Sequence, residues 1–134
     1  DTDLLIQNLE NKRLQEIIDE NGISYFEKAE EHAILSLDIK GTVIATGGSV
    51  VYSEKAMRHL KTLGKIIYLH LDYETMKGRL KNITTRGVVL KKGDTLLDMY
   101  NERLPLYKKY ADEMIVCDHQ TVEDTVISIV GLSN

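Results

Sequence analysis

The chain has 134 residues, of which 43% are hydrophobic and 28% charged, with a formal net charge of −4. This length and composition predict one globular domain over residues 1–134 with a sizeable core. Basic and acidic residues are interspersed, which excludes the footprint of a nucleic-acid-binding protein. No apolar run approaches the roughly 20 residues that a membrane helix needs. The single cysteine, Cys117, excludes an internal disulfide and fits a cytoplasmic location.

The N-terminal part of the chain predicts helices. Apolar positions at helical spacing over residues 4–20 predict a helix with a break in its middle, which Asn21–Gly22 ends. Ser24, with Glu27 three residues later, has the capping-box pattern. We therefore expect a second helix from there to about Leu37.

Two short apolar runs predict buried strands, each followed by a helix. The first run is TVIAT at 42–46, bounded by glycines, and the second is KIIYLHL at 65–71. Ser53 and Asp72 follow these runs and are typical N-cap residues. They predict helices over 54–63 and 73–82.

The C-terminal part predicts a loop, a long helix and a last strand with its helix. Residues 83–93 are polar and punctuated by glycine, which predicts a loop with a mobile part. Asp94 is placed to cap a helix to about Tyr110, which Pro105 either bends or divides. The last pair is a strand at 113–117 and a helix capped by Thr121, with Asp124 three residues on.

The alternation of strands and helices predicts an α/β fold. Because the strands are apolar on both faces, we expect a parallel sheet in three layers, covered by helices on both sides. Ligands of such sheets bind beyond the carboxyl ends of the strands. TVIAT at 42–46 ends in Gly47–Gly48–Ser49 at that edge.

Two motifs around this edge suggest chemistry, although each has a structural alternative. The Gly47–Gly48 pair lets backbone N–H groups approach a ligand, or it makes a tight turn, and spacing leaves both open. Asp1 and Asp3 form D-x-D, which can hold a hydrated Mg²⁺ and orient a hydroxyl. Taken alone, D-x-D before a helix is more often a cap.

Two arginines are further candidates. Arg86 lies in the 83–93 loop, where an arginine suits a lid that closes over phosphate, the alternative being a solvated charge. Arg103 lies next to Pro105 between apolar neighbours, although an arginine on a helix is usually a surface residue.

These pieces, in this order, resemble the shikimate kinase family, which belongs to the P-loop small-molecule kinases. The resemblance covers essentially the whole chain. The segments that carry the resemblance are DTDLLI at 1–6, GISYFEKAEEHAIL at 22–35, TVIATGGSVV at 42–51, GKIIYLHLDYETMKGRL at 64–80, TTRGVVL at 84–90 and LLDMYNERLPLYKKYADEMI at 96–115.

The resemblance implies a function and a topology. The function is ATP-dependent phosphorylation, with Mg²⁺, of a hydroxyl on shikimate or a similar small hydroxylated acid, in aromatic amino acid biosynthesis. The topology is that of P-loop NTPases of the nucleoside-monophosphate-kinase-like kind. The resemblance also implies a monomer whose partners are a small-molecule substrate and ATP, with no nucleic acid and no membrane.

The resemblance also implies the roles of individual residues at the acceptor. Asp3 would bind the substrate hydroxyls and align the attacking one. Gly47, Gly48 and Ser49 would face the substrate. Arg103 would pair with its carboxylate, where a planar guanidinium offers two hydrogen bonds, and Glu30 would position that arginine.

The nucleotide side follows from the same resemblance. Arg86 would be the lid arginine that stabilises charge on the transferring phosphoryl group and contacts the nucleotide. Arg79 would pack against adenine. Asp1 would lie near Mg²⁺, through water.

The sequence departs from the family pattern in four respects. No G-x-x-x-x-G-K-[ST] phosphate loop occurs, so we expect an N-terminally incomplete chain without the first strand and helix of the fold. Glu27 stands where the family has an arginine, Gly87 where the lid has a proline, and Ser49 where a third glycine is usual. Two alternatives therefore stay open: a kinase for a different small metabolite, and an inactive relative that binds a ligand or partner.

Overall fold

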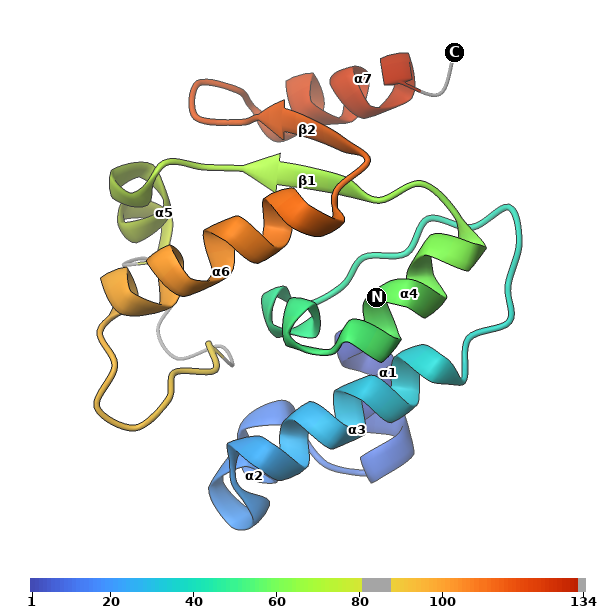
Figure 1. Ribbon diagram of the computed structural model, residues 1–134, viewed down its shortest axis with the longest axis vertical. Coiled ribbons are helices and arrows are strands. Elements are labelled where there is room, and N and C mark those ends of the chain that lie inside the picture. The colour runs from blue at the N-terminus through green and yellow to red at the C-terminus, as the bar shows by residue number, and fades with distance from the viewer. Residues whose placement is uncertain (81–87, 133–134) are drawn as a thin grey trace. The chain divides into compact units, whose positions relative to one another are not determined.

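The computed structural model describes residues 1–80 and 88–132 (Figure 1). The described residues form two compact units, one of residues 1–64 and 88–94 and one of residues 65–80 and 95–132. The expectation of one domain over 1–134 stays a prediction. The expected lid at about 83–93 lies partly outside the described residues. Among the described residues, no helix is long and apolar enough to cross a membrane.

The first unit is built around one central helix. Its elements are α1 (Thr2–Glu10), α2 (Leu14–Asn21), α3 (Ile23–Leu35), the short 3₁₀ helix η1 (Gly48–Tyr52) and α4 (Glu54–Leu63). Helix α3 contacts each of the other four elements. The core cluster includes side chains from α1, α2, α3 and the segment after residue 87: Ile6, Ile17, Phe26, Ala29, Ala33 and Val89.

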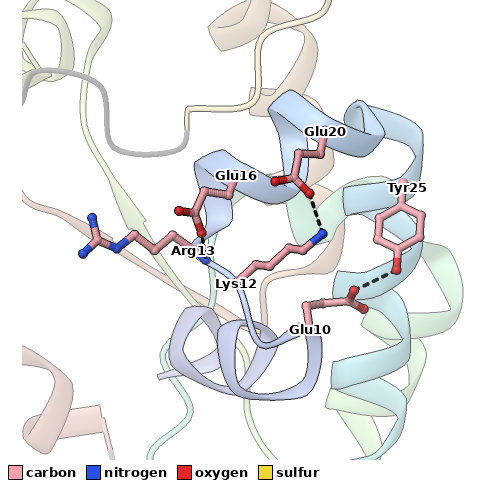
Figure 2. Close-up of polar contacts among 6 residues, drawn as sticks. All are labelled: Glu10, Lys12, Arg13, Glu16, Glu20 and Tyr25. Carbon is pink, nitrogen blue, oxygen red and sulfur yellow. Dashed lines mark hydrogen bonds and ion pairs between the residues drawn. The ribbon is translucent and has the colours of Figure 1, made fainter.

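The expected break within residues 4–20 is confirmed and lies between α1 and α2. Asn11 ends α1 in the left-handed conformation, with φ 54°, which asparagine tolerates better than most residues. Figure 2 shows the polar contacts around this break. The Lys12 ammonium pairs with the Glu20 carboxylate, and the Tyr25 hydroxyl donates to Glu10 Oε2 at 2.7 Å. These contacts tie the connection to both α2 and α3.

The second unit contains a pair of parallel strands with helices beside it. Strand β1 (Ile67–His70) pairs with β2 (Glu113–Val116) in the register Ile67 to Glu113. The helices are α5 (Tyr73–Leu80), α6 (Leu96–Tyr110) and α7 (Val122–Leu132). Figure 1 shows α6 and α7 on opposite sides of the strand pair. The expected parallel pairing is confirmed for these two strands, and Pro105 lies inside one continuous helix α6.

Three of the expected helix caps are confirmed. The Ser53 hydroxyl accepts the Ala56 N–H at 3.0 Å, and Asp72 Oδ1 accepts the Thr75 N–H at 2.7 Å. The Thr121 hydroxyl accepts the Asp124 N–H at 3.1 Å, and the Asp124 carboxylate accepts the Thr121 N–H in return. Each cap satisfies an N–H group that the helix itself leaves without a partner.

Two other expected caps were wrong by one or two residues. Helix α3 begins at Ile23 with Gly22 as its N-cap, so Ser24 is already helical. The N-cap of α6 is Thr95 rather than Asp94, because Asp98 lies three residues after Thr95 and completes a capping box with it.

The expected buried strand at 42–46 is also wrong. Among the described residues, strand pairing is confined to β1 and β2, and the 42–46 segment is irregular. The segment is largely exposed, with 92% of Val43 accessible, and Ala45 accepts a hydrogen bond from the Thr2 N–H at 2.9 Å. An apolar run becomes a strand only where a neighbouring strand offers a ladder of hydrogen bonds.

Several apolar side chains of the described strand pair are exposed, although helices flank it. Leu69 of β1 is 47% exposed, and Met114 and Val116 of β2 are exposed to a similar degree. Side chains alternate between the two faces of a strand, and in β2 the buried Ile115 alternates with these exposed neighbours.

Candidate active site

Two carboxylates from different helices converge on Gly47 in the first unit. Asp3 lies in the first turn of α1, Glu30 lies in α3, and Gly47 directly precedes η1. A Cβ atom added to Gly47 would lie 3.2 Å from Asp3 Oδ1 and 3.3 Å from Glu30 Oε2. Gly47 has φ −68°, so its backbone conformation does not call for glycine, and a side chain here would instead press on the two carboxylates.

A helix cap and one backbone hydrogen bond place the start of α1 beside the glycine-bearing segment. Asp1 Oδ1 accepts the Asp3 N–H at 2.8 Å, which makes Asp1 the N-cap of α1. The Thr2 N–H donates to the Ala45 carbonyl at 2.9 Å. The D-x-D motif is therefore a helix cap in this structure, and the same cap places Asp3 beside Gly47.

Ser49 contacts the second carboxylate of this cluster. Its hydroxyl donates to Glu30 Oε1 at 2.7 Å. Ser49 is 5% exposed and Glu30 is 3% exposed, so this hydrogen bond is shielded from water. A buried carboxylate needs such partners, because an unpaired buried charge is very costly.

The electrostatics of Asp3 follow from its partial burial. Loss of water contact disfavours the ionised carboxylate and raises the pKa of Asp3 above its ordinary value. A raised pKa makes the ionised carboxylate a better acceptor for a proton at neutral pH. Asp3 is therefore suited to orient a hydroxyl and to accept its proton.

The second unit carries two of the predicted site arginines. Arg103 lies on α6 and is 6% exposed, so the expectation that a helical arginine is a surface residue does not hold here. Arg79 lies near the end of α5 and is exposed, and its guanidinium donates to the Cys117 carbonyl at 3.2 Å. This bond anchors Arg79 beside the carboxyl end of β2.

Two tyrosines of α6, Tyr100 and Tyr107, pack within the second unit. Tyr107 stacks on Tyr68 of β1 with ring centroids 5.0 Å apart, and the Tyr100 hydroxyl donates to the Leu71 carbonyl. Burial, reinforced by neighbouring Tyr100, Tyr107 and Asp118, raises the pKa of Tyr68 to about 12. Tyr68 therefore stays neutral near pH 7, in contact with His70 Nδ1 at 3.0 Å.

The structure brings together part of the predicted site. Asp3, Gly47 and Ser49 lie in one cluster with Glu30, and Gly48 follows Gly47 at the start of η1. Arg86 lies outside the described residues. Within the described ranges 1–80 and 88–132, no group of three or more acidic, histidine or cysteine side chains is arranged to hold a metal ion.

Sequence reasoning missed the contact between Ser49 and Glu30. The two residues are 19 positions apart and lie on different elements. No local pattern in the sequence reports such a contact, because neither residue caps a helix or follows a periodicity that links them.

The parallel strand pair with its flanking helices defines an α/β fold, and the first unit carries an acidic cluster at a glycine-bearing segment. The sequence model of the family described as "SKI: Shikimate kinase" matches residues 1–132. The chain therefore belongs to the shikimate kinase family.

Individual relatives agree with this assignment. The chain is 35% identical over 135 residues to a shikimate kinase of Clostridium botulinum and 32% identical over 136 residues to one of Dictyoglomus turgidum. Each match covers 97% of this chain, and they cover 77% and 78% of the respective relatives.

Solved structures confirm the predicted fold class. The shikimate kinase of Aquifex aeolicus matches 99% of this chain with a TM-score of 0.76 and 25% identity, and the match covers 81% of that protein. The shikimate kinase of Bacteroides thetaiotaomicron matches 99% of this chain and 80% of that protein, with a TM-score of 0.74. At 20% identity, the second likeness supports the fold alone.

Proposed function

We propose that this protein transfers the γ-phosphoryl group of ATP to a hydroxyl of shikimate, with Mg²⁺, in aromatic amino acid biosynthesis. The observation that carries the proposal is the family match over residues 1–132. The convergence of Asp3 and Glu30 on Gly47 supports it, because a polyol needs acceptors for its hydroxyl protons beside an open stretch of backbone. We further propose that the protein acts as a monomer in the cytoplasm.

The acceptor hydroxyl is aligned by Asp3 in this proposal. Its carboxylate accepts a hydrogen bond from the attacking hydroxyl and takes the proton as the phosphoryl group arrives. The upward pKa shift caused by burial favours this role. Gly47 and Gly48 present backbone to the sugar-like ring, where a side chain would occupy the space next to both carboxylates.

Recognition of the substrate carboxylate is assigned to Arg103. A guanidinium binds a carboxylate through two parallel hydrogen bonds, and its burial strengthens them. The assignment rests on the family resemblance around Pro105.

The nucleotide side is assigned to Arg79, Arg86 and Asp1. Arg79 is exposed and anchored at the Cys117 carbonyl, which suits a planar group that packs against adenine. Arg86 stabilises the transferring phosphoryl group. Mg²⁺ neutralises charge on the phosphates when it is bound.

The residues present fit a magnesium ion that arrives with ATP. Mg²⁺ usually keeps several waters and takes only one or two protein carboxylates besides the phosphates. The exposed Asp1 carboxylate uses Oδ1 to cap α1 and can contact a metal-bound water as well. A dedicated cage of three protein ligands is not required.

A second candidate function is phosphorylation of a different small hydroxylated metabolite. The observation that favours it is Glu27, which lies half-buried on α3 where the family pattern has arginine. A carboxylate at this position repels an acidic substrate and tolerates a neutral one.

The test is a coupled assay of ADP release by the full-length protein, with Mg²⁺·ATP and a panel of acceptors. The panel contains shikimate, its methyl ester and neutral cyclic polyols. We expect turnover to require shikimate and to fall strongly with the methyl ester, because the ester cannot form the charged pair with Arg103. A preference for the ester or for a polyol would establish the second candidate, and ADP release independent of any acceptor would overturn both.

A further inference from the structure

We infer that Ser49 is a positioning residue that orients the Glu30 carboxylate at the acceptor site. This inference rests on the proposed function, because it assigns the acceptor to the space around Gly47. Ser49 acts through Glu30 and does not itself contact the substrate.

The two carboxylate oxygens of Glu30 have different neighbours. Glu30 Oε1 accepts the Ser49 hydroxyl at 2.7 Å. Glu30 Oε2 faces Gly47, 3.3 Å from the point where a Cβ would stand, and Asp3 Oδ1 lies 3.2 Å from the same point. The hydrogen bond to Oε1 therefore helps to determine where Oε2 lies relative to Asp3.

Such an anchor matters because the last torsion of a glutamate is soft. The terminal torsion of a carboxylate side chain has broad minima, so packing alone selects its rotation weakly. A hydrogen bond from a buried hydroxyl favours one rotation, and η1 holds Ser49 beside α3. Oriented groups of this kind lose little freedom when a ligand binds.

The hydrogen bond from Ser49 to Glu30 depends on a residue in which this chain departs from the family pattern. The family pattern has a third glycine where this chain has Ser49, and a glycine offers no hydroxyl to the carboxylate. Burial of Ser49 at 5% exposure argues against direct contact with a bulky ring and for an indirect role. Ser49 was predicted to bind the substrate, and we now assign it to the orientation of Glu30.

The chain offers a matched control for Ser49. Ser53 donates its hydroxyl to Glu31, the next residue after Glu30 on α3. Like Ser49→Ala, Ser53→Ala removes a hydrogen bond from a serine hydroxyl to a glutamate of α3. The carboxylate that loses its partner is that of Glu31, which does not face Gly47. Ser53→Ala should lower thermal stability, because Ser53 also caps α4, and should leave the KM for shikimate unchanged.

The experiment compares the full-length wild-type protein with Ser49→Ala, Ser49→Gly and Ser53→Ala. We expect Ser49→Ala and Ser49→Gly to raise the KM for shikimate roughly tenfold or more, the factor typical of one lost hydrogen bond to a charged group. The KM for ATP should not change, and kcat should change less than the KM for shikimate. An unchanged KM for shikimate in both Ser49 variants, or an equal rise in Ser53→Ala, would overturn the inference.

A crystal structure of Ser49→Ala tests the inference without any turnover. In the Ser49→Ala crystal structure we expect the Glu30 carboxylate to be rotated, so that Oε2 no longer lies beside Gly47. In the wild-type crystal structure we expect Oε2 to lie beside Gly47. If Oε2 stays beside Gly47 without the hydroxyl, Ser49 is not the positioning residue. Absence of shikimate phosphorylation by the wild type would count against the proposed function alone, because this structural comparison still decides the role of Ser49.

Discussion

Single residues carry most of the chemistry that this structure supports, and Gly47 shows why. Its neighbourhood is formed by two carboxylate oxygens, one from α1 and one from α3. A glycine in a strand-to-helix connection has an ordinary use as a turn, so the sequence left its role open. The close approach of Asp3 and Glu30 favours the functional interpretation, because the backbone here adopts φ −68° and needs no glycine for its conformation.

We predict that Gly47→Ala lowers kcat/KM strongly at little cost in stability. The new Cβ would stand 3.2 and 3.3 Å from the two carboxylates, so Asp3 and Glu30 must shift by a few tenths of an ångström. A misplacement of about 1 Å at a reacting centre can cost about a hundredfold in rate, and we expect a loss of about tenfold here. Steady-state kinetics measure this loss.

The control for Gly47→Ala is Gly64→Ala. Gly64 has φ 172°, which any residue adopts, and no atom lies within 4 Å of its added Cβ. This variant should match the wild type in both kcat/KM and melting temperature. If both variants kept full activity, the space at Gly47 would not be part of the acceptor site.

A second prediction at this scale concerns Asp3→Asn. The fold raises the pKa of Asp3, so the native state binds the proton more tightly than the unfolded chain does. The stability that this adds is fully present below the ordinary pKa of 3.8 and is lost as the pH rises through the raised value. At pH 7 the buried charge is a net cost, so we expect Asp3→Asn to unfold at a higher urea concentration while losing activity.

The pH dependence provides the control for Asp3→Asn. The difference between the two proteins should shrink as the pH falls, because both are then uncharged at position 3. Asp38→Asn, at an exposed position in the same unit, should leave the urea midpoint almost unchanged. A lower midpoint for Asp3→Asn at pH 7 would show that the negative charge stabilises the start of α1 more than its burial costs.

At the scale of elements, the helix starts were set by short-range hydrogen bonds. Ser53, Asp72 and Thr121 cap the helices that follow them, as their residue types predicted. The start of α6 was misplaced by one residue, because Asp94 and Thr95 are both favourable caps. The reciprocal bonds with Asp98 decide between them.

We predict that Thr95→Ala lowers the free energy of unfolding by about 1 kcal/mol, the usual cost of a lost N-cap. Asp94→Ala is the matched control and should have almost no effect, because Asp94 lies one residue outside the capping box. Urea unfolding of the two variants measures the difference. Equal losses would mean that α6 begins elsewhere in solution.

At the scale of the whole molecule, the described residues form two compact units, each with its own packing. The assigned residues are divided between them: Asp3 and Ser49 in the first unit, Arg79 and Arg103 in the second. Cys117, the only cysteine of the chain, is 4% exposed in the second unit and reports on the opening of that unit.

We predict that shikimate stabilises the protein and protects Cys117. A ligand that binds only the folded state at 100 times its Kd adds about 2.7 kcal/mol to the free energy of unfolding. Because the Cys117 thiol is buried, we expect that it can be labelled only when the protein unfolds. Shikimate at 100 times its Kd should therefore slow the labelling of Cys117 by about a hundredfold. The Kd for shikimate is first determined by titration. The rate of thiol labelling is then measured with and without shikimate at 100 times that Kd.

The labelling experiment separates two outcomes. Slower labelling together with a higher melting temperature would show that acceptor binding stabilises the unit that carries Arg103. A melting temperature that does not change at saturating shikimate would contradict the proposed acceptor. Arg103→Lys should weaken the protection, because a lysine keeps the charge but cannot form the two parallel hydrogen bonds.

The sequence by itself determined the features that depend on neighbours along the chain. Helical spacing and the caps at Ser53, Asp72 and Thr121 involve residues within one turn, and the ordered motifs identified the family. Only the tertiary structure decided the state of residues 42–46, since a strand requires a partner ladder from elsewhere in the fold. It alone also showed the bond from Ser49 to Glu30 and the meeting of Asp3 and Glu30 at Gly47, because these contacts join residues far apart in the chain.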